Sequence, residues 1–240
     1  ETLWSVNKLA RRVHCWNRAC DKRLHRLIEY LRGIANWVQL CFVCDIPEDC
    51  WLGLFVDASF AGDIKDSKST NGAYLCIVGP RAFVPVTWIC KRQTAVSHSS
   101  FEAEVISLES ALRMEGLPSL MLWETIMDVF SQTKGSPSGA AKPSERSRKQ
   151  RHPYTTPFSM FEDLDYVPCT IPKSLGRGRL IMFEDNDAVI KACMKGRSQA
   201  MRHVARTHRV DLDWLWEHIR EDPGVFIRYV GTKSQIGDLF

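Results

Sequence analysis

The chain has 240 residues, of which 45% are hydrophobic and 25% are charged, as is usual for a folded globular protein. This length allows one large domain or two small ones. The net charge of +4 is a mild basic excess, which by itself favours a nucleic-acid partner only weakly, because affinity for phosphate depends on where the charge lies.

The nine cysteines are scattered and form no disulfide framework. The chain begins with no secretory signal, and its apolar runs, such as residues 37–43, are too short to span a bilayer. These features predict reduced thiols in an intracellular protein that does not associate with membranes. Cys41 and Cys44 form a CxxC, but no second pair follows at zinc-finger spacing, so a structural zinc is the less favoured interpretation. The start at Glu1 and the end at Phe240, inside a predicted helix, suggest a fragment of a longer protein.

The first part of the chain is predicted to be helical. Leu24, Leu27 and Leu31 recur at helical spacing, with basic residues between them. We therefore predict a helical segment at residues 1–48, followed by a domain at residues 49–240.

Three apolar segments follow in close succession. Residues 51–62 begin as a short apolar strand and break into small and polar residues. Residues 72–78 and 83–89 each have the composition of a strand, and Gly79 and Pro80 supply a turn between them. Three consecutive strands with short connections predict an antiparallel meander.

A helix is predicted to begin at Ser99. Ser99 and Glu102 fit the capping box, in which each side chain accepts a hydrogen bond from a free backbone N–H group at the start of the helix. A second helix is predicted at about 118–130. Residues 131–177 form an insert that is rich in Ser, Pro and basic residues. Such a segment has too little apolar surface to form a core, so we predict that it is disordered.

The regular pattern then resumes. It predicts a strand at 179–185, helices at 186–194 and 207–221, a strand at 226–230 and the start of a helix at Ser234. The whole order predicts an α/β fold, a mixed sheet with helices on its faces.

Four acidic residues lie where they can take part in chemistry: Asp57 and Asp185 end apolar strands, Glu104 lies in the second turn of the capped helix, and Asp238 lies in the last segment. An acid at the end of an apolar strand is costly to bury unless a cation or a proton compensates it. Converging carboxylates suit Mg²⁺, and two such ions can assist cleavage of a phosphodiester bond. Periodicity alone leaves open whether the four converge, and an aspartate at a strand end is also explained as a turn or cap residue.

Seven blocks of the sequence carry a resemblance to a known family. They are WSVNKLAR, ACDKRLHRLIEYL, DASFAGDIKDSKSTNG, VTWICKRQTAVSHSSFEAEVISL, FEDNDAVIKA, RTHRVDLDWL and YVGTKSQIGDLF. Together, and in this order, they resemble the ribonuclease H region of copia-type retrotransposon Pol polyproteins. The resemblance covers most of the chain outside the 131–177 insert. It implies a ribonuclease H-like mixed five-stranded sheet with helices on both faces.

The resemblance also implies a four-acid metal site. Asp57 matches the aspartate of the first-strand block, Glu104 the second glutamate of the SSTEAE-like block, Asp185 the aspartate of DNxxA and Asp238 that of the ADILTK-like ending. These four would bind two Mg²⁺ ions, with Mn²⁺ as an alternative. Glu102 is the competing choice in its block, but the capping box gives it a structural role.

The resemblance further implies an endonuclease that cuts the RNA strand of RNA–DNA hybrids. Its partners would be the hybrid and the remainder of the Pol polyprotein, including reverse transcriptase. It would act in the cytoplasm, inside a virus-like particle, or in the nucleus. No polymerase acid pair of the YxDD kind is present, so DNA synthesis is not expected.

A basic segment that leads into the helix predicted at 207–221 is a candidate phosphate contact. It contains Arg202, His203, Arg206, His208 and Arg209. A phosphate-binding patch and a plain solvated face explain these residues equally well, and phosphate contacts would not read sequence.

Two alternatives to an active ribonuclease remain. The insert and the end of the chain soon after Asp238 favour a catalytically decayed remnant that acts at most as a nucleic-acid-binding module. An integrase core is less favoured: Asp185 and Glu221 have a suitable spacing, but the surrounding blocks resemble the ribonuclease.

Overall fold

The computed structural model describes residues 2–62, 67–133, 173–196 and 211–239. Residues 1–127 and 173–240 form one compact unit, and residues 128–172 form a second. The boundary expected near residue 48 stays a prediction.

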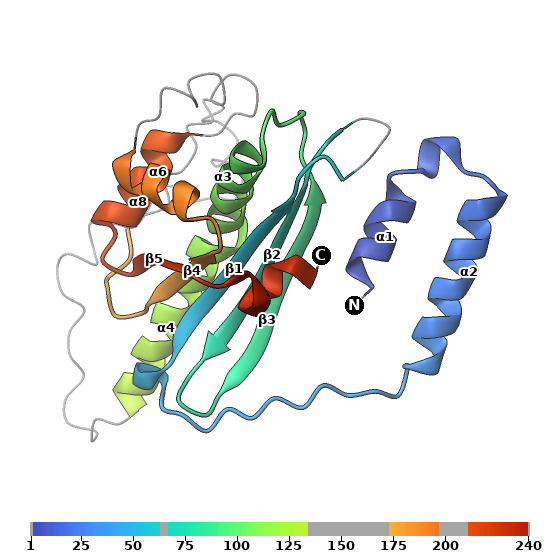
Figure 1. The fold of residues 1–240 in the computed structure, drawn as a ribbon. Helices are drawn as coiled ribbons and strands as arrows, with labels where there is room; N and C mark the ends of the chain where they lie inside the picture. The colour runs from blue at the N-terminus through green and yellow to red at the C-terminus, as the bar shows by residue number, and fades with distance from the viewer. Residues whose placement is uncertain (1, 63–66, 134–172, 197–210, 240) are drawn as a thin grey trace, which may run out of the picture. The chain divides into compact units, whose positions relative to one another are not determined.

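The centre of the first unit is a five-stranded mixed sheet (Figure 1). Its order is β3-β2-β1-β4-β5, with antiparallel pairing among β1, β2 and β3 and parallel pairing of β4 with β1 and β5. The strands are β1 (Trp51–Ser59), β2 (Thr70–Val78), β3 (Phe83–Arg92), β4 (Leu180–Glu184) and β5 (Val225–Tyr229). The predicted meander and the predicted α/β class, with a ribonuclease H-like mixed sheet, are confirmed.

The helices lie close to the predicted positions. They are α1 (Leu3–Ala10), α2 (Arg18–Gly33), α3 (Ser100–Ala111), α4 (Leu117–Thr133), α6 (Asp187–Lys195) and α8 (Leu212–Glu221). Two predictions need correction. Residues 37–46 form no helix, and the last segment forms two 3₁₀ turns, Thr232–Ser234 and Ile236–Leu239, in place of an α-helix.

The core is built where α3 packs against β1 and β2 (Figure 1). Leu54 of β1, Leu108 of α3 and Leu180 of β4 are fully buried. Helical segments cover both faces of the sheet. Leu54 approaches Gly116, in the turn that follows α3. Asp57, an odd number of residues further along β1, lies against Gly237 in the last turn. Because alternate residues of a strand face opposite sides, these two contacts lie on different faces.

The loop before β4 is held by one buried carboxylate. Glu124 of α4 accepts hydrogen bonds from the backbone N–H groups of Leu175, Arg177 and Gly178, at 2.9, 3.0 and 3.2 Å. The end of the predicted insert is therefore an ordered loop, and its beginning, residues 131–133, continues α4. Residues 134–172 lie outside the described residues.

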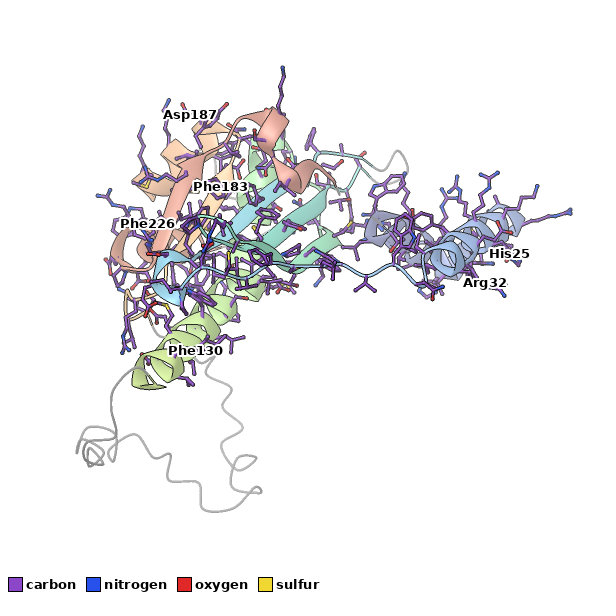
Figure 2. All side chains as sticks on the ribbon, turned by 90° about the horizontal axis from the view of Figure 1, so that it is seen from below. His25, Arg32, Phe130, Phe183, Asp187 and Phe226 are labelled. Atoms are coloured by element: carbon purple, nitrogen blue, oxygen red, sulfur yellow. The ribbon has the colours of Figure 1, made fainter. Side chains whose placement is uncertain are left out.

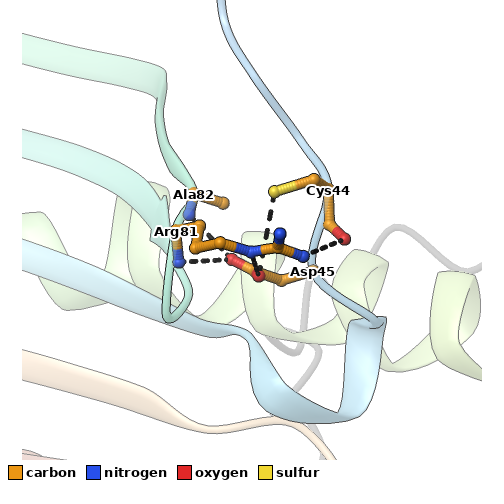
Figure 3. A network of polar contacts seen from close by, with 4 residues as sticks. All are labelled: Cys44, Asp45, Arg81 and Ala82. Carbon is orange, nitrogen blue, oxygen red and sulfur yellow. Dashed lines mark hydrogen bonds and ion pairs between the residues drawn. The ribbon is translucent and has the colours of Figure 1, made fainter.

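The segment between α2 and β1 is fastened to the turn between β2 and β3 (Figure 3). Asp45 accepts hydrogen bonds from the backbone N–H groups of Arg81 and Ala82, at 2.8 and 2.7 Å, and the Arg81 side chain reaches the Cys44 carbonyl. These donors, the Arg81 N–H first, hold the pKa of Asp45 below its usual value. This contact fixes where the connecting segment enters the sheet.

Among the described residues, no helix is both long enough and apolar enough to cross a bilayer.

Candidate metal centre

The candidate site lies where β1 and β4 end. These two strands are parallel neighbours, and Phe55 pairs with Phe183. Asp57 and Asp185 each lie two residues further along, so the same register brings both acids to one edge of the sheet. The stacked rings of Phe55 and Phe183, with centroids 4.6 Å apart, keep the two strands aligned just before the acids.

Three carboxylates meet at this edge. Ligand oxygens of Glu104, Glu184 and Asp185 all lie within 4.8 Å of one another. Glu184 is fully buried, Glu104 is 8% exposed, and Asp185 is half-buried. Carboxylate oxygens at this spacing are suited to a hard divalent cation such as Mg²⁺.

Neutral polar side chains hold two of these acids. Asn186 Nδ2 donates to Glu104 Oε2 at 2.6 Å, and Ser100 Oγ donates to Glu104 Oε1 at 3.1 Å. Thr232 Oγ1 donates to Asp185 Oδ2 at 3.0 Å. Asn186 also caps α6, because its Oδ1 accepts a hydrogen bond from the N–H of Ala188, so the same residue starts the helix and orients Glu104.

Burial, together with repulsion between the carboxylates, raises the pKa of two of these acids. Burial, then repulsion from Glu104, Asp185 and Asp57, raises the pKa of Glu184 to about 9. Burial also raises the pKa of Glu104; hydrogen bonds from Asn186 and Ser100 oppose this effect, and repulsion from Asp185 adds to it. A bound cation would offset the repulsion and favour the charged forms.

Asp57 lies beside this group without being one of its three members. It is close enough to raise the pKa of Glu184, and its carbonyl accepts a hydrogen bond from Ser107 Oγ at 2.8 Å. Gly237 lies directly against it: a Cβ at that position would stand 3.0 Å from Asp57 Cβ and 3.1 Å from its backbone nitrogen. Glycine at this position lets the last turn approach β1 this closely without displacing its backbone.

The last turn brings Asp238 to the same region. The backbone of Asp238 belongs to the 3₁₀ turn Ile236–Leu239, and its side chain lies outside the described part of the structure. Gln235 fastens this turn: its Nε2 donates to the carbonyls of Val56 at 2.8 Å and Phe183 at 3.4 Å. One amide therefore joins the last turn to both strands that carry the acids.

We predict that Gln235→Leu lowers any metal-dependent activity of the site roughly 10-fold or more, because small displacements of reacting groups are costly. The side chain is buried, and leucine has a similar volume but cannot donate to the two carbonyls. Steady-state activity and a thermal melt of the same sample separate mispositioning from unfolding. A folded variant with unchanged activity would contradict this role for Gln235.

Glu184 was not among the residues expected at the site. The signal was present in the strand: Leu180, Met182 and Glu184 alternate with more exposed residues, so Glu184 continues the buried side of β4. An acid at a buried position of a strand requires a partner. The alternation of side chains along β4 would therefore have identified Glu184 as a candidate site residue.

Glu102 has the structural role that was expected, with one difference. Ser99 Oγ accepts a hydrogen bond from the Glu102 N–H at 3.1 Å, and Glu102 Oε2 accepts from the N–H of His98, one residue before Ser99. The carboxylate is thus engaged at the start of α3. The other expected contacts, Arg202, His203, Arg206, His208 and Arg209, lie outside the described residues.

Comparison with known proteins gives a partial likeness. The chain is 31% identical over 119 residues to the retrovirus-related Pol polyprotein from transposon RE1 of Arabidopsis thaliana, a match over 49% of this chain and 8% of that polyprotein. It is also 31% identical over 105 residues to the corresponding polyprotein from transposon RE2, over 44% of this chain and 7% of that polyprotein. The chain resembles part of a retrotransposon Pol polyprotein. It spans less than a tenth of the length of these two relatives. No protein-family model and no solved structure matches it.

Proposed function

We propose that this chain is a metal-dependent endonuclease of ribonuclease H type, which cuts the RNA strand of RNA–DNA hybrids as part of a Pol polyprotein. The observation that carries the proposal is the meeting of Glu104, Glu184 and Asp185 beside Asp57, at the ends of two parallel strands. The mixed sheet and the likeness to two Pol polyproteins support it.

In this proposal Asp57, Glu104, Asp185 and Asp238 bind two Mg²⁺ ions, or Mn²⁺ in their place. Bound ions of this kind activate a water molecule and stabilise the leaving oxygen of the phosphodiester. Asn186 and Thr232 orient Glu104 and Asp185, and the buried Glu184 adds negative charge behind them. The 2′-hydroxyl of the RNA strand is the group that distinguishes it from DNA.

The test is cleavage of a labelled RNA–DNA hybrid by the wild-type chain and by Asp57→Asn. We expect the wild-type chain to cut the RNA strand with Mg²⁺ and not with a chelator, and Asp57→Asn to lose at least about 100-fold of this activity, as expected for loss of a metal ligand. Asp187→Asn is the matched control. Asp187 is a nearby acid that points into solvent, 61% exposed, and pairs with Lys191 one helical turn along (Figure 2).

Two outcomes would contradict the proposal. If Asp57→Asn and Asp187→Asn lower cleavage equally, the activity does not come from this site. If the folded wild-type chain binds the hybrid but does not cut it, the chain is a decayed nucleic-acid-binding module.

A further inference from the structure

The first 33 residues of this protein are strongly basic. They contain eight lysines and arginines against three acids, so their excess is larger than the net charge of +4 of the whole chain. Long basic side chains project from α2, among them Arg32 (Figure 2). The pair α1 and α2 is therefore a surface that attracts an anionic partner.

A pocket of about 570 Å³ lies between these two helices. Trp4 and Lys8 line it from α1; Arg23, Arg26 and Tyr30 line it from α2. Residues 23, 26 and 30 fall on one face of α2, as the helical repeat requires. The pocket thus combines two aromatic rings with three cationic side chains, and its volume is in the range that holds small ligands.

The aromatic and cationic groups are accessible. Trp4 is 46% exposed and Tyr30 is 40% exposed, both high values for large rings at the wall of a pocket. Lys8 Nζ lies over one face of the Trp4 ring, 3.8 Å from its centre, so the charge and the aromatic ring stand together in the pocket. Within the part of the chain that the structure describes, neither Arg23 nor Arg26 forms an ion pair.

We propose that this pocket binds an unpaired stretch of a nucleic acid strand. A base stacks against the ring of Trp4 or Tyr30, and the flanking phosphates contact Lys8, Arg23 and Arg26. Single-strand sites in proteins combine these two elements, aromatic platforms and a positively charged groove. An unpaired base of a single strand can enter a concave pocket between two helices. The bases of a duplex are stacked and paired inside it and cannot. An acidic peptide would use the cations but would gain nothing from the exposed rings.

The experiment measures binding by the full chain, with a chelator present so that nothing is cut. The probe is a short fluorescein-labelled oligothymidylate, followed by fluorescence anisotropy. The pocket variant is Arg23→Gln/Arg26→Gln. The control is Arg18→Gln/Lys22→Gln, which removes the same charge from exposed positions of the same helix outside the pocket. Glutamine keeps a helix propensity close to that of arginine and lysine, so both variants should fold.

We expect the pocket variant to weaken binding about tenfold or more and the control by less than about threefold, because only the pocket cations contact phosphate. Trp4→Leu should weaken binding at least about fivefold through the lost stacking. The same Trp4→Leu variant should bind polyglutamate as the wild type does. Since binding needs none of the acids of the metal centre, a chain that cuts no hybrid can still pass this test.

Equal losses in the pocket and control variants would overturn the proposal, because diffuse charge would then explain the binding. Full affinity of Trp4→Leu for the oligothymidylate would also overturn it, since the rings would have no part. A wild-type chain that prefers polyglutamate or anionic vesicles would assign the pocket to a different partner. Circular dichroism of each variant verifies that α1 and α2 are still formed.

Discussion

Asp185→Asn is expected to abolish the stabilisation of this chain by Mg²⁺. Saturating a site raises the free energy of unfolding by about 2.7 kcal/mol when the ligand is present at 100 times its Kd. For a chain of this size, that gain corresponds to a rise in Tm of roughly 5–10 °C. Asp185 is the half-buried member of the three acids and the one that Thr232 holds, so its loss would remove one of the proposed metal ligands.

The measurement is the Tm of wild-type, Asp185→Asn and Asp187→Asn chains with Mg²⁺ and with a chelator. The Asp187→Asn control removes the same charge two residues away and should keep the full shift. Cleavage of the hybrid should fall with Asp185→Asn at least about 100-fold. A Tm shift that survives in Asp185→Asn would mean that Mg²⁺ binds somewhere other than at these acids.

Glu184→Gln is expected to stabilise the chain when no metal is present. The pKa of Glu184 is raised from 4.5 to about 9, so the folded protein holds a proton that the unfolded protein releases above about pH 4.5. The stabilising contribution of this proton is therefore full below about pH 4.5 and is lost as pH rises through about 9. Over that window the loss approaches about 1.4 kcal/mol per pH unit for one group.

Glutamine resembles the protonated acid and has no such pH dependence. We therefore expect Glu184→Gln to be more stable than the wild type by roughly 2 kcal/mol or more at neutral pH with a chelator present. Urea denaturation at about pH 5.5, 7 and 8.5 measures the free energy of unfolding of both chains. Mg²⁺ should reduce the difference in stability between them, because a cation favours the charged form of Glu184. Glu29→Gln, at an exposed position of α2, is the control. Parallel stability curves for wild type and Glu184→Gln would contradict the prediction.

The two variants together distinguish a metal site from a cluster of acids that only repel one another. If the acids bind Mg²⁺, Asp185→Asn loses the response to the ion while Glu184→Gln changes mainly the stability without it. If the acids bind no cation, both substitutions stabilise the chain and neither changes its response to Mg²⁺. These outcomes do not depend on whether a suitable substrate has been found.

The elements of the sheet were predictable from the chain alone. The apolar runs that became β1, β2 and β3 are bounded by turn residues, and Ser99 marks the start of α3 through its own side chain. These signals are local, since each depends on residues a few positions apart. The prediction was wrong at residues 37–46 and in the last segment, where no local signal distinguishes a helix from a 3₁₀ turn or an extended connection.

The sequence by itself therefore determined the class of the fold and the placement of Asp185 directly after a strand, whereas Asp57, expected at a strand end, lies inside β1, which continues to Ser59. Only the tertiary structure decided which side chains meet there. Glu184 joined the site because its parity on β4 turns it toward Glu104, 80 residues earlier in the chain. Gln235 reaches the carbonyl of Val56 across a separation of 179 residues. Such contacts depend on strand order and register, which are set by the burial of the whole sheet, and no local pattern in the chain records them.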